Sequence, residues 1–108
     1  MTPEGAVVKA ILDYLAVRRI YAWRNQTGAT RIDDGKRFIR FGHVGSSDIL
    51  GILDDGRFLA IEVKGPKGRA SMAQLVFLAE IAKRGGLAFV AWGVEDVERE
   101  LAKPRRTA

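Results

Sequence analysis

The sequence predicts a single α/β domain in which helices flank a mixed β-sheet. Two observations support this fold class. Two apolar, strand-like segments near the middle of the chain are joined by a tight turn, and a later apolar segment follows a helix-like one. The tight turn gives an antiparallel pair, whereas a helical crossover favours a parallel pair, so both strand directions are expected. A chain of 108 residues can bury one modest core but not two.

The first part of the chain predicts a helix, a short strand and an irregular region. The helix is expected from Thr2, a favourable capping residue, to about Arg18, because apolar residues recur at helical spacing between them. Residues 20–23 are rich in side chains that favour strands. The turn signal Asp33-Asp34-Gly35 lies within residues 24–47, which predict a ragged hairpin or a long loop.

The middle of the chain predicts a clean hairpin followed by a second helix. Residues 49–53 and 58–63 flank the turn Asp54-Asp55-Gly56, and both segments are mainly apolar. Ser71 is a favourable cap for the helix, which the pair Gly85-Gly86 would end. The expected buried face of this helix consists of Met72, Leu75, Val76, Leu78, Ala79 and Ala82.

The last third predicts a strand, a helix and a basic tail. Residues 87–92 are apolar throughout, which predicts a strand in the centre of the sheet. A final helix is expected to begin at Glu95-Asp96. The domain is therefore expected to span residues 1–103, with residues 104–108 as a frayed basic tail.

Composition and charge narrow the class of partner. The formal net charge is +5 and the sequence pI is near 10.0, so a polyanion such as nucleic acid is the favoured partner. No apolar run approaches the roughly 20 residues that span a bilayer, and the first residues do not resemble a signal peptide. Cysteine is absent, which fits a reducing compartment. We expect the cytoplasm of a bacterium or of a phage-infected host.

Two carboxylates are expected at one end of the central hairpin. Counting outward from its turn places Asp48 beside Glu62. Two carboxylates at one point repel each other unless a cation neutralises them, and oxygen ligands of this kind suit Mg²⁺ or Mn²⁺. The carbonyl oxygen of Val63 could add a further ligand.

Lys64 follows the same strand and completes a possible reaction centre. Its side chain lies on the same strand face as that of Glu62, because side chains alternate along a strand. Its ammonium could orient a metal-activated water or stabilise charge that develops on a phosphate. The alternative is a solvated pair of Glu62 and Lys64 with Asp48 as an ordinary turn acid. The three residues together, at this spacing, favour phosphodiester hydrolysis.

The stretches "SSDILGI" and "AIEVKGPKGRASMAQ" resemble the D-x(n)-E-x-K signature of the PD-(D/E)XK nuclease superfamily. The second stretch, with Glu-Val-Lys-Gly, a short basic loop and then Gln74, is similar to the VRR-NUC (virus-type replication-repair nuclease) domain. The resemblance implies a restriction-endonuclease-like αβββαβ core, metal binding by Asp48 and Glu62, and a catalytic role for Lys64.

The resemblance also implies roles for two further residues. Glu4 on the first helix would join the metal site, although an acid in a first helical turn is also expected from the helix dipole alone. Gln74 would support the catalytic group from the second helix, although a polar residue in a first turn is unremarkable. This sequence departs from the family at Ser47, where many relatives have proline.

Basic and small residues around the acids predict DNA contacts. Lys67 and Arg69 lie in the glycine-containing loop that follows Lys64, and they could contact phosphates. Ser47 belongs to a run of small residues that leaves room for a DNA backbone, and Arg24 follows the first strand. The alternative for the basic loop is a simple surface turn.

The predicted function is that of a metal-dependent DNA endonuclease with Mg²⁺ or Mn²⁺ as cofactor. The resemblance implies selectivity for branched DNA such as Holliday junctions, a role in replication, repair or recombination, and a homodimer with two active sites. One alternative is a catalytically inactive, basic nucleic-acid-binding module. Another is a small structural α/β protein whose basic charge is incidental.

Overall fold

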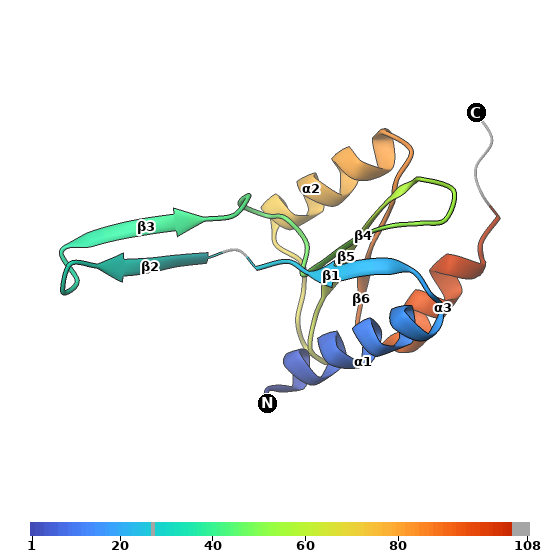
Figure 1. Cartoon of the computed structure of the whole chain (residues 1–108), viewed down its shortest axis with the longest axis horizontal. Coiled ribbons are helices and arrows are strands. Elements are labelled where there is room, and N and C mark those ends of the chain that lie inside the picture. Colours follow the sequence, from blue (N-terminus) through green and yellow to red (C-terminus); the bar gives the residue numbers. More distant parts are fainter. Residues whose placement is uncertain (27, 105–108) are drawn as a thin grey trace.

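A computed structural model describes residues 1–26 and 28–104 of the chain (Figure 1). Helices and strands follow one another in an order close to the predicted one, with an additional pair of strands after the first. The elements are α1 (Pro3–Val17), β1 (Tyr21–Arg24), β2 (Gly28–Ile32), β3 (Arg37–Phe41), β4 (Ile49–Ile52), β5 (Phe58–Val63), α2 (Met72–Lys83), β6 (Leu87–Ala91) and α3 (Val94–Ala102).

The main sheet has four strands in the order β1-β4-β5-β6. Strands β1 and β5 both pair with β4 in the antiparallel direction, while β5 and β6 are parallel. The predicted mixed sheet is thus confirmed. Helix α2 covers one face of the sheet, and α1 and α3 lie together on the other (Figure 1).

The hydrophobic core fills the space between the sheet and the pair α1 and α3. Ile11 of α1, Ile61 of β5 and Val97 of α3 are all fully buried in it. Helix α1 begins as predicted, because the Thr2 hydroxyl accepts a hydrogen bond from the Gly5 N–H at 3.0 Å. The β4–β5 hairpin is therefore packed against this core.

Two expectations about packing were wrong. Strand β6 lies at an edge of the sheet and not at its centre. It is apolar nevertheless, because α2 and α3 cover it from the two faces. In α2, the predicted buried face is also incorrect. Of its six residues only Leu78 is buried, and the side turned to the sheet runs through the partly buried Phe77 and Ile81. Apolar residues occur around most of this helix, so their spacing does not select one face.

Within residues 24–47, for which the sequence predicts a ragged hairpin or a long loop, β2 and β3 form a second hairpin. These strands pair with each other in an antiparallel register, Arg31 opposite Phe38, and the hairpin projects away from the main sheet (Figure 1). The turn signal at Asp33-Asp34-Gly35 is confirmed, since all three residues have φ between 54° and 85°. The described part of residues 24–47 therefore contains the β2–β3 hairpin as well as loops.

In the described part of the chain, every helix is too short or too polar to cross a membrane. Of the predicted basic tail, Pro104 is exposed, and residues 105–108 lie outside the described residues.

Candidate active site

The β4–β5 hairpin brings Asp48 and Glu62 to the same end of the sheet. Ile49 pairs with Ile61 and Ile52 with Phe58, so the same register places Asp48 opposite Glu62, as the turn length predicts. The Asp48 carboxylate accepts a hydrogen bond from the Val63 N–H at 2.8 Å. This bond ties the Asp48 side chain to the strand that carries Glu62.

Glu62 is a buried carboxyl group, with 2% of its surface exposed. Burial, together with the hydrogen bond and the negative charge of the neighbouring Asp48, raises the pKa of Glu62 to about 8. The Lys64 ammonium acts in the opposite direction, and the Glu4 carboxylate adds a smaller upward shift. Without a further cation, the Glu62 carboxyl is therefore mainly protonated at neutral pH.

Lys64 directly follows β5 and leans back toward the acid pair. Its Nζ lies 3.7 Å from Glu62 Oε1, and only 15% of its side chain is exposed. The Lys64 N–H donates to the Ala91 carbonyl at 3.0 Å, which holds the start of the following loop against the end of β6. A single ammonium at this distance offsets the two acids only in part, as the raised pKa of Glu62 shows.

The acid pair fits a divalent cation. Glu62 Oε2 is buried and has no hydrogen-bond partner, and an unpaired buried oxygen of this kind costs free energy, which a bound cation would relieve. Among the described residues, no three His, Cys, Asp or Glu side chains cluster closely enough to hold a metal ion as they lie. A metal at Asp48 and Glu62 would then take its remaining ligands from backbone oxygens such as that of Val63, from water and from substrate phosphate.

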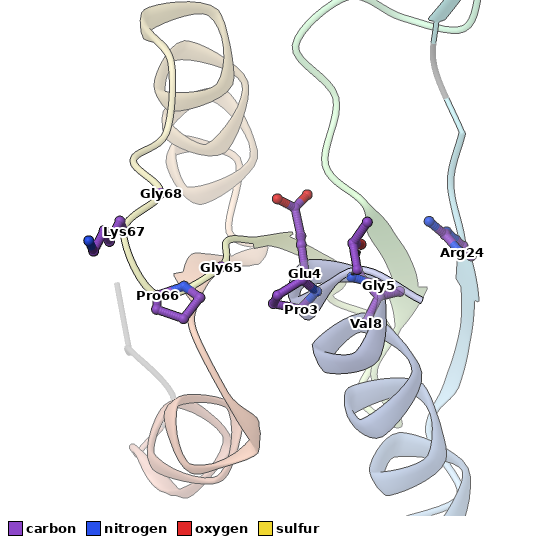
Figure 2. Close-up of a pocket in the computed structure, with 10 residues that line it drawn as sticks. Pro3, Glu4, Gly5, Val8, Arg24, Gly65, Pro66, Lys67 and Gly68 are labelled. Carbon is purple, nitrogen blue, oxygen red and sulfur yellow. Dashed lines mark hydrogen bonds between the residues drawn. The ribbon is translucent and has the colours of Figure 1, made fainter.

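Glu4 stands at the start of α1 and faces a neighbouring cavity. Figure 2 shows its carboxylate between Arg24 and the loop that contains Gly65 and Gly68. Its charge reaches Glu62, as the direction of that pKa shift indicates. Glu4 does not complete a three-acid cluster as its side chain lies, so its role as a metal ligand stays a prediction.

The cavity beside Glu4 has a volume of about 650 Å³ and two basic residues on its walls. The first turn of α1, Arg24 and residues 65–68 line it. Arg24 and Lys67 are both exposed, on opposite sides of Glu4 (Figure 2). The loop is held by the Trp92 indole N–H, which donates to the Gly68 carbonyl at 3.1 Å. The structure therefore gathers Arg24 and Lys67 around one open space that Glu4 also lines.

The remaining predicted DNA contacts differ in exposure. Arg69 is exposed, and its guanidinium donates to the Gly68 carbonyl at 3.2 Å. Ser47 is only 1% exposed, and its hydroxyl has no hydrogen-bond partner. We expect no direct DNA contact from Ser47 in this position, because its side chain offers almost no surface.

Gln74 has a clear local role at the start of α2. Its side-chain oxygen accepts from the Ser71 N–H at 2.8 Å, and its own N–H donates to the Ser71 hydroxyl at 3.2 Å, which forms a capping box. A contribution of Gln74 to catalysis stays a prediction.

Asn25, for which the sequence predicts no role, lies against the segment that ends in Asp48. Its side-chain amide donates to Ser46 Oγ and to the Ser47 carbonyl, and its backbone N–H donates to the Asp48 carbonyl. The partners are more than twenty residues away along the chain, so no local pattern indicates these contacts.

Comparisons with known proteins concern the family and the fold of the chain. The family model of the VRR-NUC domain matches residues 8–95, which include Asp48, Glu62 and Lys64. A solved structure described as a VRR_NUC domain is similar with a TM-score of 0.67 and 22% sequence identity, over 94% of this chain and 96% of that chain. At this identity the likeness shows the fold alone. A search of curated proteins gave no match.

Proposed function

Because this chain belongs to the VRR-NUC family, whose domain is a nuclease domain of the PD-(D/E)XK type, we propose that it is a metal-dependent DNA endonuclease. The observation that carries the proposal is the acid pair at the end of the β4–β5 hairpin. Asp48 is fixed by the Val63 N–H, and Glu62 carries a buried oxygen without a partner. A structural role alone does not account for two acids placed together with one of them buried.

In the proposed reaction, Asp48 and Glu62 bind the metal and Lys64 acts on the reacting groups. Bound Mg²⁺ or Mn²⁺ would supply a site for an acidified water and would neutralise phosphate charge. To serve as a ligand the Glu62 carboxyl would have to lose its proton, and a nearby cation would favour this by lowering its pKa from about 8. The Lys64 ammonium, held beside Glu62, orients the attacking water and stabilises charge on the phosphate oxygens.

DNA would enter along the cavity that Glu4 lines, next to the loop that follows Lys64. Arg24 and Lys67 are the basic side chains on its walls, and Arg69 lies just beyond Gly68. Each can contact a backbone phosphate, which positions the duplex without reading its sequence. The net charge of +5 favours the same partner.

The preferred substrate in this proposal is branched DNA, such as a Holliday junction. The contacts above are all of the phosphate-binding kind, so selectivity for DNA shape is expected over selectivity for base sequence. Resolution of a junction needs two cuts in opposed strands. One chain carries one such acid pair among its described residues, so two chains would act together as a homodimer.

The test is a panel of branched and linear DNAs incubated with and without Mn²⁺. The wild-type chain should cut only with the metal, and Asp48→Ala, Glu62→Ala and Lys64→Ala should each lower the rate by at least about 100-fold. Asp13→Asn and Lys9→Ala, which alter an exposed ion pair on α1, are matched controls and should cut normally. Wild-type rates in all three site variants would refute the assignment. Retained DNA affinity in a wild-type chain that never cuts would identify the inactive binding module instead.

A further inference from the structure

Asn25 contacts Asp48 and the two residues before it. The Asn25 side-chain amide donates to Ser46 Oγ at 2.7 Å and to the Ser47 carbonyl at 2.9 Å. Its backbone N–H donates to the Asp48 carbonyl at 2.7 Å. One half-buried residue thus contacts three consecutive residues that lead into β4.

These contacts lie where regular pairing of the sheet stops. The ladder between β1 and β4 ends with Arg24 opposite Ile49, so Asp48 lies just outside the paired strands. The backbone bond from Asn25 extends the ladder by one residue, and its amide holds the two residues before that. On the other side, the Asp48 carboxylate accepts a hydrogen bond from the Val63 N–H of β5 at 2.8 Å. Asp48 is therefore held by β5 through its side chain and by Asn25 through its backbone.

The chemistry of asparagine suits this position. The amide nitrogen carries two N–H donors, and its two partners are a hydroxyl and a carbonyl oxygen. Aspartate has nearly the same shape but only acceptors, so it would place a carboxylate against the Ser47 carbonyl and close to Asp48. Alanine would remove both bonds and leave the segment before β4 without them.

We propose that Asn25 is a positioning residue that holds Asp48 in the orientation needed for metal binding. Asn25 acts through residues 46–48 and does not itself contact the metal or the DNA. The inference rests on the proposed function, because it assigns Asp48 to a metal site. Partners that orient the ligands of a metal typically contribute 10- to 100-fold to its affinity, so an effect of about tenfold is expected here.

The experiment measures Mn²⁺ affinity by calorimetry without DNA, beside the Mn²⁺ dependence of cleavage. Asn25→Ala should weaken Mn²⁺ binding about tenfold and raise the Mn²⁺ concentration for half-maximal cleavage by the same factor. The rate at saturating Mn²⁺ and the DNA affinity without metal should stay within about twofold of wild type. The exposed neighbouring amide provides the matched control, and Gln26→Ala should behave as wild type.

Wild-type Mn²⁺ affinity in Asn25→Ala would overturn the proposal, as would equal losses of metal-free DNA affinity and Mn²⁺ affinity, which indicate a general defect. If circular dichroism shows that Asn25→Ala is unfolded, Ser46→Ala takes its place, since it removes only the 2.7 Å bond. It should weaken Mn²⁺ binding a few-fold, and an unchanged affinity would overturn the proposal. If the wild-type chain binds no Mn²⁺ and cuts no DNA, the proposed function itself fails, which is a different result from a normal wild type with an unaffected variant.

Discussion

The chain contains two antiparallel hairpins with opposite surroundings. In the β4–β5 hairpin, helices cover both faces of β5, and its residues from Leu59 to Val63 are all buried. The β2–β3 hairpin projects from the body, its strands pair chiefly with each other, and Ile39 is 43% exposed. The hairpin built into the core can hold two acids together in a buried position, because the packing of its strands offsets the cost of bringing them there.

The two hairpins should differ most in the free energy of unfolding that is lost when an isoleucine is truncated in each. Ile61→Ala removes a fully buried side chain from β5 and should lower the free energy of unfolding by about 3 kcal/mol. Ile39→Ala alters the projecting hairpin and should lower it by less than about 1 kcal/mol. Urea unfolding followed by circular dichroism measures both. Equal losses of unfolding free energy in the two variants would contradict this difference in packing between the hairpins.

The second difference concerns buried charge and pH. The pKa of Glu62 is about 8 in the folded chain, above the ordinary value of 4.5. The folded chain therefore keeps a proton that the unfolded chain loses between about pH 4.5 and pH 8, so this group makes the protein less stable as pH rises through that window. Without metal, Glu62→Gln should raise the free energy of unfolding by on the order of 1 to 3 kcal/mol at pH 8. The gain should vanish near pH 4.5.

The matched variant for this prediction is Asp34→Asn at the exposed turn of the β2–β3 hairpin. It should change the free energy of unfolding by less than about 0.5 kcal/mol at either pH. Excess Mn²⁺ should reverse the order, because only the wild-type chain gains stability from the bound ion. A gain in Glu62→Gln that is the same at pH 4.5 and pH 8 would contradict the assignment of the pKa.

The smallest difference is expected at the two turns. Gly56 and Gly35 have nearly equal φ of 88° and 85°, and a Cβ added to either would meet nothing within 4 Å. Alanine is therefore strained by a similar amount at both positions, about 1 kcal/mol. Gly56→Ala should lower the melting temperature by several degrees, whereas Gly35→Ala should leave it nearly unchanged, since the projecting hairpin can open locally. Equal shifts in differential scanning calorimetry would mean that the projecting hairpin unfolds with the core.

The same contrast explains what could be predicted from the sequence. The turn at residues 54–56 fixes the register of the hairpin that it closes, so counting from it sufficed to place Asp48 opposite Glu62. The edge position of β6 could not be predicted from the sequence. An apolar run indicates that both faces of a strand are covered, but it does not indicate which strands are its neighbours. The buried face of α2 could not be predicted either, because apolar residues occur around most of that helix.

Side-chain contacts between residues far apart in the sequence could not be predicted either. Asn25 contacts residues 46–48 only because the β2–β3 hairpin brings the chain back to the end of β1. The capping box of Ser71 and Gln74 was readable in principle, since Ser and Gln three residues apart are its signature. Local patterns thus predict the acid pair and the caps, whereas the residues that hold the acid pair follow from tertiary structure.

The central claim is that Asp48 and Glu62 together bind a divalent ion, and proton release on Mn²⁺ binding tests it most directly. Calorimetric titrations at pH 7, in buffers of different ionisation enthalpy, should show Mn²⁺ binding with release of nearly one proton, because the pKa of Glu62 is about 8 before the ion binds. Glu62→Gln should lose both the proton release and most of the affinity. Absence of Mn²⁺ binding in the wild-type chain, or binding that Glu62→Gln leaves unchanged, would contradict the claim.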